Sequence, residues 1–214
     1  APVGREGIMQ RSTLLVGTFL SAEIGRRSVC EDLSERLSAA GWAVLAVSGR
    51  AGRLSRLLDI ASTAWRQRAD YAVAQIDVFS GRAFLWAEVA AWAVQRAGRP
   101  FVLTLRGGDL PGFAARWPGR IRRLLASAAA VTTPSGYLLE KLQPYRNDLL
   151  LLPNPLDLGA YRFRVRAQPA PRLMWLRAFH RVYNPALAVR VLARLRQAFP
   201  DAHLTMVGYD KGDG

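Results

Sequence analysis

The chain has 214 residues, half of them apolar, and it carries a formal net charge of +14 at pH 7. This length exceeds the roughly 100 to 150 residues of a typical single domain, and the apolar content is ample for a buried core, which excludes a disordered chain. Cys30 is its single cysteine, which excludes an internal disulfide framework, and no CxxC pair or Cys/His cluster offers a structural zinc site.

No apolar run reaches the roughly 18 to 20 residues that span a bilayer, and the first residues do not resemble a signal peptide. We therefore expect a cytoplasmic protein. The positive charge comes almost wholly from arginine, because Lys141 and Lys211 are the only lysines among 30 basic residues. Guanidinium groups pair well with phosphate oxygens, so nucleic acid, anionic lipid and nucleotide sugars are all candidate ligands. Genome composition also produces such a bias, and charge alone does not choose between the two origins.

Apolar runs with the length of strands alternate with helical patterns along the first two thirds of the chain. The predicted strands are Thr13–Gly17, Trp42–Ser48, Tyr71–Ile76, Phe101–Leu105, Ala130–Thr133 and Leu149–Leu152. The predicted helices are Ser28–Ala40, Leu54–Arg68, Ser80–Gln95, a segment around Ile121–Ala128, and Gly136–Leu142. This alternation predicts an α/β fold with a parallel, Rossmann-like sheet.

A polar, arginine-rich stretch punctuated by prolines runs from Asp157 to Arg172, and we interpret it as the region of an interdomain linker. The strand patterns at 172–176 and 204–207, with a helix from 185 to about 199, predict the first βαβ unit of a second Rossmann-like domain. The expected organisation is a domain over 1–160, a linker over 161–171, and an incomplete domain over 172–214. The glycine-bearing turn after Val207 is where phosphate-bearing ligands usually bind, so we expect the chain to stop within a binding site.

Several motifs occur in a fixed order, and together they point to a family. They are LTLRGGDL (103–110), TPSGYL (133–138), LLPNPLDL (151–158), LRAFHRVYNP (176–185) and MVGYDKGDG (206–214). In this order they resemble the family 4 glycosyltransferases of GT-B fold, over nearly the whole chain. The resemblance implies two Rossmann-like domains, the first mainly holding the acceptor and the second the nucleotide-sugar donor. It also implies sugar transfer with retention of anomeric configuration, without a metal or other cofactor, and a donor-side pair of glutamates beyond Gly214.

A catalyst of this transfer must stabilise the negative charge that grows on the departing diphosphate. In the resembled family an arginine after the strand that corresponds to 172–176, and a lysine a few residues later, hold the diphosphate. Arg177 matches the arginine, and Arg181 stands in the neighbourhood of the lysine. The alternative is that both arginines lie on a solvated surface loop. His180 is expected either to contact the ligand or to order the loop, so Arg177 and His180 are the candidate catalytic residues.

Four residues are candidates for donor binding, namely Arg181, Asn184, Gly208 and Lys211. Gly208 would allow close approach of a nucleoside diphosphate, and Lys211 would lie near the phosphates. Asn184 precedes Pro185 and is also a natural N-cap, because its side-chain oxygen can accept a hydrogen bond from an early helix amide.

The candidate acceptor-binding residues follow strands of the first domain and are Gly25, Arg26, Asp77, Ser80, Arg106, Gly107, Gly108 and Asp109. Gly25 and Arg26 precede a helix start, which suits an anion or a hydroxyl-rich acceptor. Asp77 and Ser80 offer hydrogen-bonding partners to acceptor hydroxyls. Arg106 supplies a cation, and the residues after it supply two glycines for close approach and a carboxylate. A tight turn or a cap explains those three residues equally well.

The segment Pro111–Leu125 interleaves aromatic and apolar residues with arginines. Such a segment can lie on an anionic membrane, which would suit a lipid-linked acceptor, but packing onto the sheet explains the same pattern. The sequence thus predicts a cytoplasmic glycosyltransferase, peripheral at the inner face of the membrane, that transfers a sugar from a nucleotide-diphosphate sugar to a glycan or lipid-linked acceptor of a surface or secreted polysaccharide. The alternative is a non-enzymatic basic module for nucleic acid or anionic membrane. The lack of helix-turn-helix, RNP and zinc motifs disfavours nucleic acid as a partner.

Overall fold

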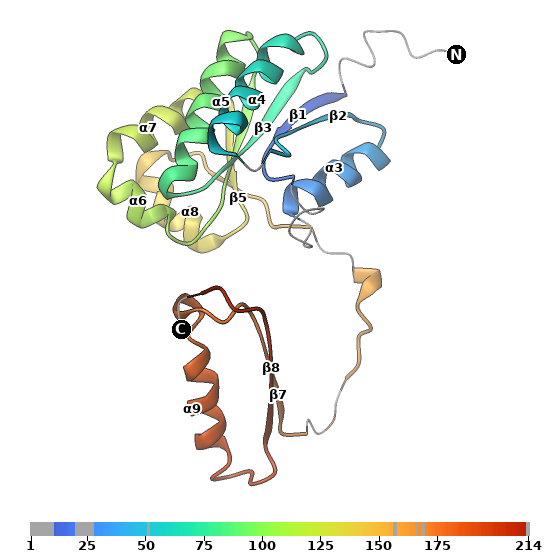
Figure 1. Cartoon of the computed structure of the whole chain (residues 1–214), viewed down its shortest axis with the longest axis vertical. Helices are drawn as coiled ribbons and strands as arrows, with labels where there is room; N and C mark the ends of the chain where they lie inside the picture. The colour runs from blue at the N-terminus through green and yellow to red at the C-terminus, as the bar shows by residue number, and fades with distance from the viewer. Residues whose placement is uncertain are drawn as a thin grey trace. The chain divides into compact units, whose positions relative to one another are not determined.

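The structure is a computed structural model that describes residues 11–19, 28–50, 52–155, 158–165, 167 and 170–212. The chain divides into two compact units, Ala1–Leu156 and Asp157–Gly214 (Figure 1). The division falls where the arginine-rich stretch begins. None of the helices in the described ranges is long and apolar enough to cross a membrane.

Unit 1 is built on a six-stranded parallel sheet with the strand order β2-β1-β3-β4-β5-β6. The strands are β1 (Ser12–Val16), β2 (Ala43–Val47), β3 (Val73–Val78), β4 (Phe101–Leu105), β5 (Ala130–Thr133) and β6 (Leu150–Leu151). The predicted Rossmann-like α/β fold with a parallel sheet is confirmed.

The helices of unit 1 lie between these strands, as the alternating pattern predicted. They are α3 (Val29–Ala39), α4 (Arg53–Arg66), α5 (Phe84–Arg96), α6 (Leu110–Arg116), α7 (Pro118–Ser127) and α8 (Gly136–Leu142), with 3-10 turns η1 (Gly81–Ala83) and η2 (Gln143–Tyr145). Helix α6 was not predicted. The chain after β4 forms two helices because Trp117, with φ −130° and ψ 56°, interrupts the first, and Pro118 begins the second.

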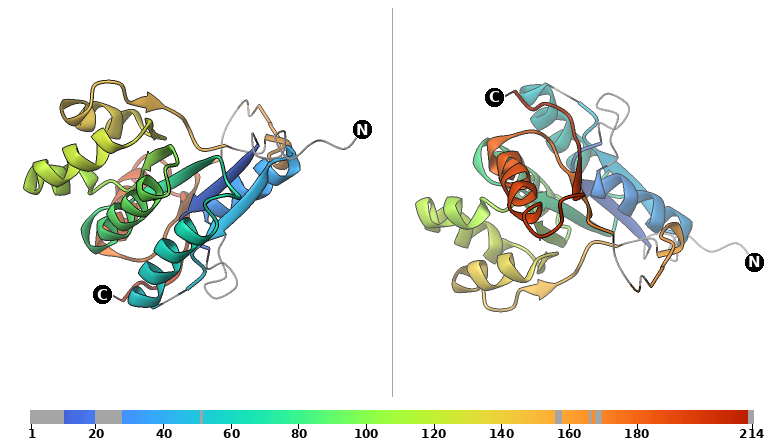
Figure 2. Two further views of the ribbon diagram at one scale, coloured as in Figure 1. Left: turned by 90° about the horizontal axis from the view of Figure 1, so that it is seen from above. Right: turned by 90° about the horizontal axis from the view of Figure 1, so that it is seen from below.

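Helix α3 covers one face of the sheet, and the other helices of unit 1 cover the opposite face (Figures 1 and 2). The step from β1 to β2 runs in one direction across the sheet and all later steps run in the other, so right-handed crossovers place the connecting helices on opposite faces. The core lies on the side of α4, α5, α7 and α8. It is formed by alternate strand residues such as Leu14, Ile76, Leu103 and Val131.

The opposite face of the sheet carries polar residues toward the carboxyl ends of its central strands. Asp77 of β3 is in register with Thr104 of β4, and Thr104 is in register with Thr132 of β5. Gln75 lies two positions before Asp77 and therefore on the same face. The face of the sheet that α3 covers is thus partly polar, whereas the face toward the core is apolar.

The basic-aromatic segment 111–125 packs onto the core. Ile121, Leu124 and Leu125 are buried, and the rings of Phe113 and Phe84 lie 4.7 Å apart. Arg120 pairs with Glu88 across this contact. These contacts favour packing over membrane contact as the reason for the segment's pattern.

Unit 2 contains a βαβ unit, as predicted. Strands β7 (Arg172–Leu176) and β8 (His203–Val207) pair in parallel, and α9 (Pro185–Leu195) connects them, preceded by a 3-10 turn η4 (Arg181–Tyr183). Helix α9 ends before the predicted limit near Phe199. A further 3-10 turn, η3 (Leu158–Ala160), lies at the beginning of the unit.

Candidate functional site

The strand order of unit 1 reverses between β1 and β3, and ligands of open α/β sheets bind outside the carboxyl ends of strands at such a point. Gly17 directly follows β1, and Asp77 lies near the end of β3. A Cβ atom on Gly17 would lie only 3.5 Å from Oδ2 of Asp77. Gly17 and Asp77 therefore lie next to each other where the strand order reverses, and we place the candidate site at this point.

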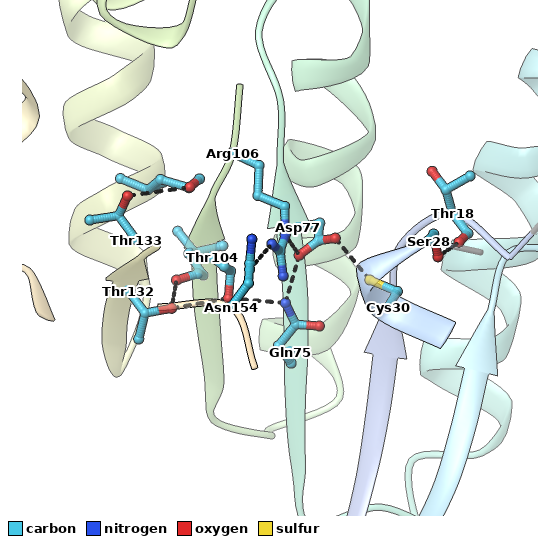
Figure 3. A network of polar contacts seen from close by, with 12 residues as sticks. Thr18, Ser28, Cys30, Gln75, Asp77, Thr104, Arg106, Thr132, Thr133 and Asn154 are labelled. Carbon is cyan, nitrogen blue, oxygen red and sulfur yellow. Dashed lines mark hydrogen bonds and ion pairs between the residues drawn. The ribbon is translucent and has the colours of Figure 1, made fainter. Parts of the chain in front are cut away.

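The Asp77 carboxylate is the centre of a polar network (Figure 3). Its Oδ1 accepts hydrogen bonds from Arg106 Nε at 2.7 Å and from Gln75 Nε2 at 2.8 Å, and its Oδ2 accepts one from Cys30 Sγ at 2.8 Å. The Asp77 side chain is only 5% exposed. With these three donors already bound, the carboxylate holds neighbouring side chains in place.

The Arg106 guanidinium is equally well occupied. Beyond its ion pair with Asp77, its Nη1 donates to Oδ1 of Asn154 at 2.9 Å (Figure 3). Asn154 comes from the segment after β6, so Arg106 connects the ends of β3, β4 and β6. The Arg106 side chain is 11% exposed, and its charge is compensated within the protein.

A row of hydrogen bonds extends this network across the sheet. Gln75 Nε2 also donates to Thr104 Oγ1 at 3.0 Å, and Thr104 Oγ1 and Thr132 Oγ1 lie 3.0 Å apart. The other amide atom, Gln75 Oε1, is buried and has no hydrogen-bond partner among the residues the structure describes. Buried polar atoms usually have a partner in the protein or in ordered water, so this oxygen is an exception within the network.

Cys30 is a buried structural thiol. Burial raises its pKa far above the ordinary value, and the nearby Asp77 carboxylate raises it further. A Cβ atom on Gly17 would lie 2.2 Å from the Cys30 sulfur, so a glycine is required where β1 meets α3. A protonated, buried thiol is a poor nucleophile, so Cys30 acts as a hydrogen-bond donor to Asp77.

The start of α3 is fixed at the same sheet edge. Ser28 is its N-cap and forms a capping box with Glu31, and the Ser28 hydroxyl donates to the carbonyl oxygen of Thr18 at 2.5 Å. This bond attaches the helix start to the segment after β1. The amino end of α3 therefore borders the polar network.

A cavity of about 390 Å³ opens beside the network. Apart from Asp77 of β3, its lining comes from the segments that follow five strands of the sheet. The lining residues are Thr18, Ser28, Val29, Asp77, Phe79, Arg106, Gly107, Gly108, Pro134, Ser135, Tyr137, Leu138 and Asn154. A second, mainly apolar cavity of about 420 Å³ lies on the sheet face beside α3 and shares Val29, Arg106 and Asn154 with the first. Hydroxyl, amide and carboxylate groups in the first cavity suit a hydroxyl-bearing ligand.

The predicted acceptor residues are placed as follows. Asp77, Arg106, Gly107 and Gly108 line the same cavity. Ser80 and Asp109 do not line it, and Asp109, at the N-cap position of α6, makes no side-chain capping bond. Gly107 has φ +90°, a conformation that favours glycine. Gly25 and Arg26 lie outside the described residues.

Sequence reasoning missed Gln75, Thr104 and Cys30 as members of the site, and it did not predict the bond between Arg106 and Asn154. A signal for the first two exists. Polar residues at alternate positions of otherwise apolar strands share one face, and Gln75, Asp77 and Thr104 follow this rule. Nothing in the sequence near Cys30 indicates its bond to a residue 47 positions away.

The predicted donor residues lie in unit 2, after its two strands. The guanidinium carbon of Arg177 lies 5.5 Å from the ring centre of Tyr183, and Lys211 Nζ lies 5.9 Å from the same ring centre. Two cations therefore meet at one aromatic ring. Neither of them makes an ion pair with any residue of the described ranges.

His180 orders the loop between β7 and α9, one of the two roles expected for it. Its Nδ1 accepts a hydrogen bond from the backbone amide of Val182 at 3.2 Å. In the neutral ring this bond leaves the proton on Nε2, which is then the donor atom. His180 thus belongs to the architecture of the loop that carries Arg181.

A cavity of about 560 Å³ lies at the amino end of α9. Its lining includes Phe179, His180, Arg181, Asn184 and Asp210. The expectation that the Asn184 side chain caps the helix is wrong, because the residue is left-handed, with φ 49° and ψ 58°, and makes no side-chain capping bond. The Asn184 side chain therefore does not cap the first backbone amides of α9.

Gly208 is required by the backbone of unit 2. A Cβ atom at this position would lie 1.6 Å from the carbonyl oxygen of Arg177. In this structure Gly208 allows the end of β7 to come close to the end of β8. The expected approach of a nucleotide to Gly208 stays a prediction. Backbone hydrogen bonds continue this contact into the loops after β7 and β8. The Phe179 amide donates to the carbonyl oxygen of Tyr209, and the Lys211 amide donates to the carbonyl oxygen of Phe179.

The comparisons with known proteins show a fold likeness. The structure is similar to the crystal structure of a glycosyltransferase from Rickettsia africae ESF-5, with a TM-score of 0.51 and 10% sequence identity, over 94% of this chain and 68% of that chain. No protein-family model matches the sequence, and no curated protein matches it significantly. At this identity the likeness shows a shared fold. No group of three or more metal-ligating side chains was found within the described ranges.

Proposed function

We propose that this chain carries out glycosyl transfer, moving a sugar from a nucleotide-diphosphate sugar to a glycan or lipid-linked acceptor with retention of configuration. The fold likeness to a glycosyltransferase supports the general reaction. The residues support a division of labour in which unit 2 binds the donor diphosphate and unit 1 binds the acceptor.

The observation that carries the proposal is the difference in charge compensation between the two sites. In unit 1, Arg106 is paired with the buried Asp77, so the cavity beside it has no uncompensated cation from this pair. In unit 2, Arg177 and Lys211 share Tyr183 and make no ion pair within the described ranges. A diphosphate needs uncompensated cations, whereas a hydroxyl-bearing acceptor needs balanced donors and acceptors.

The chemistry follows from this division. As the bond from the anomeric carbon to the diphosphate breaks, negative charge accumulates on the phosphate oxygens. Arg177 and Lys211 stabilise that charge, and the amino end of α9 adds its backbone dipoles. His180 holds the loop that presents Arg181. In unit 1, the Asp77–Arg106 pair holds the cavity walls that orient the acceptor.

Titration calorimetry with UDP, GDP, ADP and dTDP tests the donor assignment. We expect saturable binding of one of these nucleotides. The double variant Arg177→Gln/Lys211→Gln should weaken it at least about tenfold, because charge-assisted bonds to phosphate are lost. The double variant Arg190→Gln/Arg194→Gln, which keeps Arg177 and Lys211, is the matched control. It removes two charges from the exposed side of α9 and should leave the affinity nearly unchanged.

Three results would count against the proposal. An equal loss in both double variants would mean that net charge alone attracts the nucleotide. A loss caused by Arg106→Gln instead would move the donor to unit 1. Absence of nucleotide binding together with salt-steep binding of nucleic acid would favour the basic binding module. Once an acceptor is found, the anomeric proton coupling of the product reports whether configuration is retained.

A further inference from the structure

The outer side of α4 carries an apolar stripe that faces away from the core. Ile60 and Ala64 of this helix are buried, yet Leu54, Leu58 and Trp65 are 77%, 71% and 50% exposed. These three residues are separated by multiples of about one helical turn and share one side of the helix. Helix α4 is therefore apolar on two sides, of which only one is used in the core.

The neighbouring helix α5 continues this surface. The two helices pack side by side (Figure 1), and Trp92 of α5 is 56% exposed. Trp65 and Trp92 border a hollow of about 560 Å³, together with Arg66 and Arg96. We name this surface, formed by Leu54, Leu58, Trp65, Arg66, Trp92 and Arg96, the α4–α5 face.

An arginine guanidinium lies over the ring of each tryptophan of the α4–α5 face. The guanidinium carbon of Arg68 lies 4.7 Å from the ring centre of Trp65, and that of Arg96 lies 5.4 Å from the ring centre of Trp92. The acidic residues of the two helices, Asp59 and Glu88, are each paired with an arginine. The face is therefore apolar and positively charged at once.

We propose that the α4–α5 face docks on the surface of a bilayer that contains anionic phospholipid. Indole rings and leucine side chains partition into the boundary between headgroups and acyl chains, and guanidinium groups beside them pair with lipid phosphates. A symmetric contact with a second copy would bring the same arginines against each other. Nucleic acid would match the arginines and the indoles, but it offers no apolar phase for Leu54 and Leu58.

This inference is independent of the proposed function and concerns a different surface from the segment 111–125, in which Ile121, Leu124 and Leu125 are buried. It adds a membrane contact without a membrane-crossing helix. It also gives part of the arginine excess a physical role, because each basic side chain near an anionic surface strengthens binding.

Vesicle co-sedimentation tests the proposal with two lipid compositions, phosphatidylcholine alone and phosphatidylcholine mixed with phosphatidylglycerol. We expect binding to the mixed vesicles, weakened by salt and accompanied by a blue shift of tryptophan fluorescence. Trp65→Ser/Trp92→Ser and Arg66→Gln/Arg96→Gln should each lower the affinity at least about tenfold. Thermal melting should show that these exposed substitutions leave the fold intact.

Matched controls separate this face from net charge and from general surface hydrophobicity. Trp117→Ser removes a tryptophan that is 48% exposed elsewhere, and Arg190→Gln/Arg194→Gln removes two charges from α9. Both should bind vesicles as the parent does. The proposal is overturned if the controls lose as much affinity as the face variants, or if neutral and anionic vesicles bind equally. It is also overturned if the face variants abolish self-association in light scattering while vesicle binding persists.

Discussion

The Asp77–Arg106 ion pair is buried, and this burial sets the cost of disrupting it. The side chains are 5% and 11% exposed. Removing one partner of a buried pair leaves an uncompensated charge, so Arg106→Met should lower the free energy of unfolding by about 3 kcal/mol in urea denaturation. The double variant Arg106→Met/Asp77→Leu should be less destabilised, because it leaves no buried charge.

The exposed Glu140–Lys141 pair is the control for this prediction, since its side chains are 70% and 49% exposed. Glu140→Gln should produce no measurable change, because solvent screens such pairs. If Arg106→Met also left the stability unchanged, the network would contribute nothing to the fold. The role of Asp77 as its centre would then have to be abandoned.

The Cys30 thiol predicts a loss of stability at alkaline pH. Burial and the Asp77 carboxylate raise its pKa in the folded protein, so the folded chain keeps this proton while the unfolded chain loses it above about pH 9. A raised folded pKa gives stability that is present below the unfolded pKa and declines above it. The free energy of unfolding should fall by at most about 1.4 kcal/mol per pH unit for this one group.

Denaturation between pH 8 and pH 10.5, roughly spanning the ordinary pKa of a thiol, measures this slope. Cys30→Ala should show a shallower decline than the parent chain. Burial also raises the pKa of Tyr71, so some alkaline loss should persist in both proteins. Identical slopes in the two proteins, or rapid reaction of native Cys30 with a thiol reagent at pH 8, would show that the thiol is accessible.

At the scale of single elements, the pairing of β7 with β8 depends on Gly208. Because a Cβ atom there would meet the Arg177 carbonyl oxygen at 1.6 Å, Gly208→Ala should separate the strand ends and cost about 3 kcal/mol or more. Hydrogen exchange followed by mass spectrometry should show lost protection in β7 and β8. The loop that carries Lys211 should lose its order as well.

Gly136→Ala is the matched glycine control. Gly136 begins α8, and a Cβ atom there would meet nothing within 4 Å. Alanine has the higher helix propensity, so this variant should keep or slightly raise the stability. If Gly208→Ala were tolerated as well as Gly136→Ala, the contact between the two strand ends would not be what requires the glycine.

For the whole molecule, the two units should differ in their ability to fold alone. The main core cluster, from Leu14 to Leu149, belongs entirely to unit 1. In unit 2 many apolar side chains of β7 and α9 are exposed, including Met174 at 70% and Val189 at 53%. Residues 1–156 should therefore unfold cooperatively by themselves, whereas residues 157–214 should not, because a two-stranded sheet with one helix buries too little apolar surface.

Circular dichroism melting and amide NMR spectra of the two separate segments check this expectation. A sharp transition and dispersed spectra for residues 157–214 would show that the small unit has a sufficient core of its own. A molten spectrum for residues 1–156 would show that the large unit depends on the rest of the chain.

Local pattern was enough to predict most of the elements. Strands β4, β5 and β7 and helix α8 have the predicted bounds, because runs of apolar residues bounded by turn signals leave few alternatives. Helix α6 escaped prediction, since seven residues containing a proline and a glycine show no clear helical period. The sequence also indicated that Asp77 and Arg106 lie near the carboxyl ends of two strands, although Asp77 is inside β3 rather than after it.

The identity of each residue's partner was decided by the tertiary structure alone. Arg106 and Arg177 look alike in sequence, as each follows a strand and precedes a loop, yet within the described ranges only Arg106 has a buried carboxylate beside it. Cys30 donates to Asp77 across 47 positions, and Asn184 adopts a left-handed conformation in place of the predicted cap. Periodicity reports which face of an element is apolar, whereas hydrogen bonding depends on distances and angles that long-range packing sets. The sequence therefore supplied the elements and their polar strand ends, and the packing of those elements determined which charges are compensated and which remain available to a ligand.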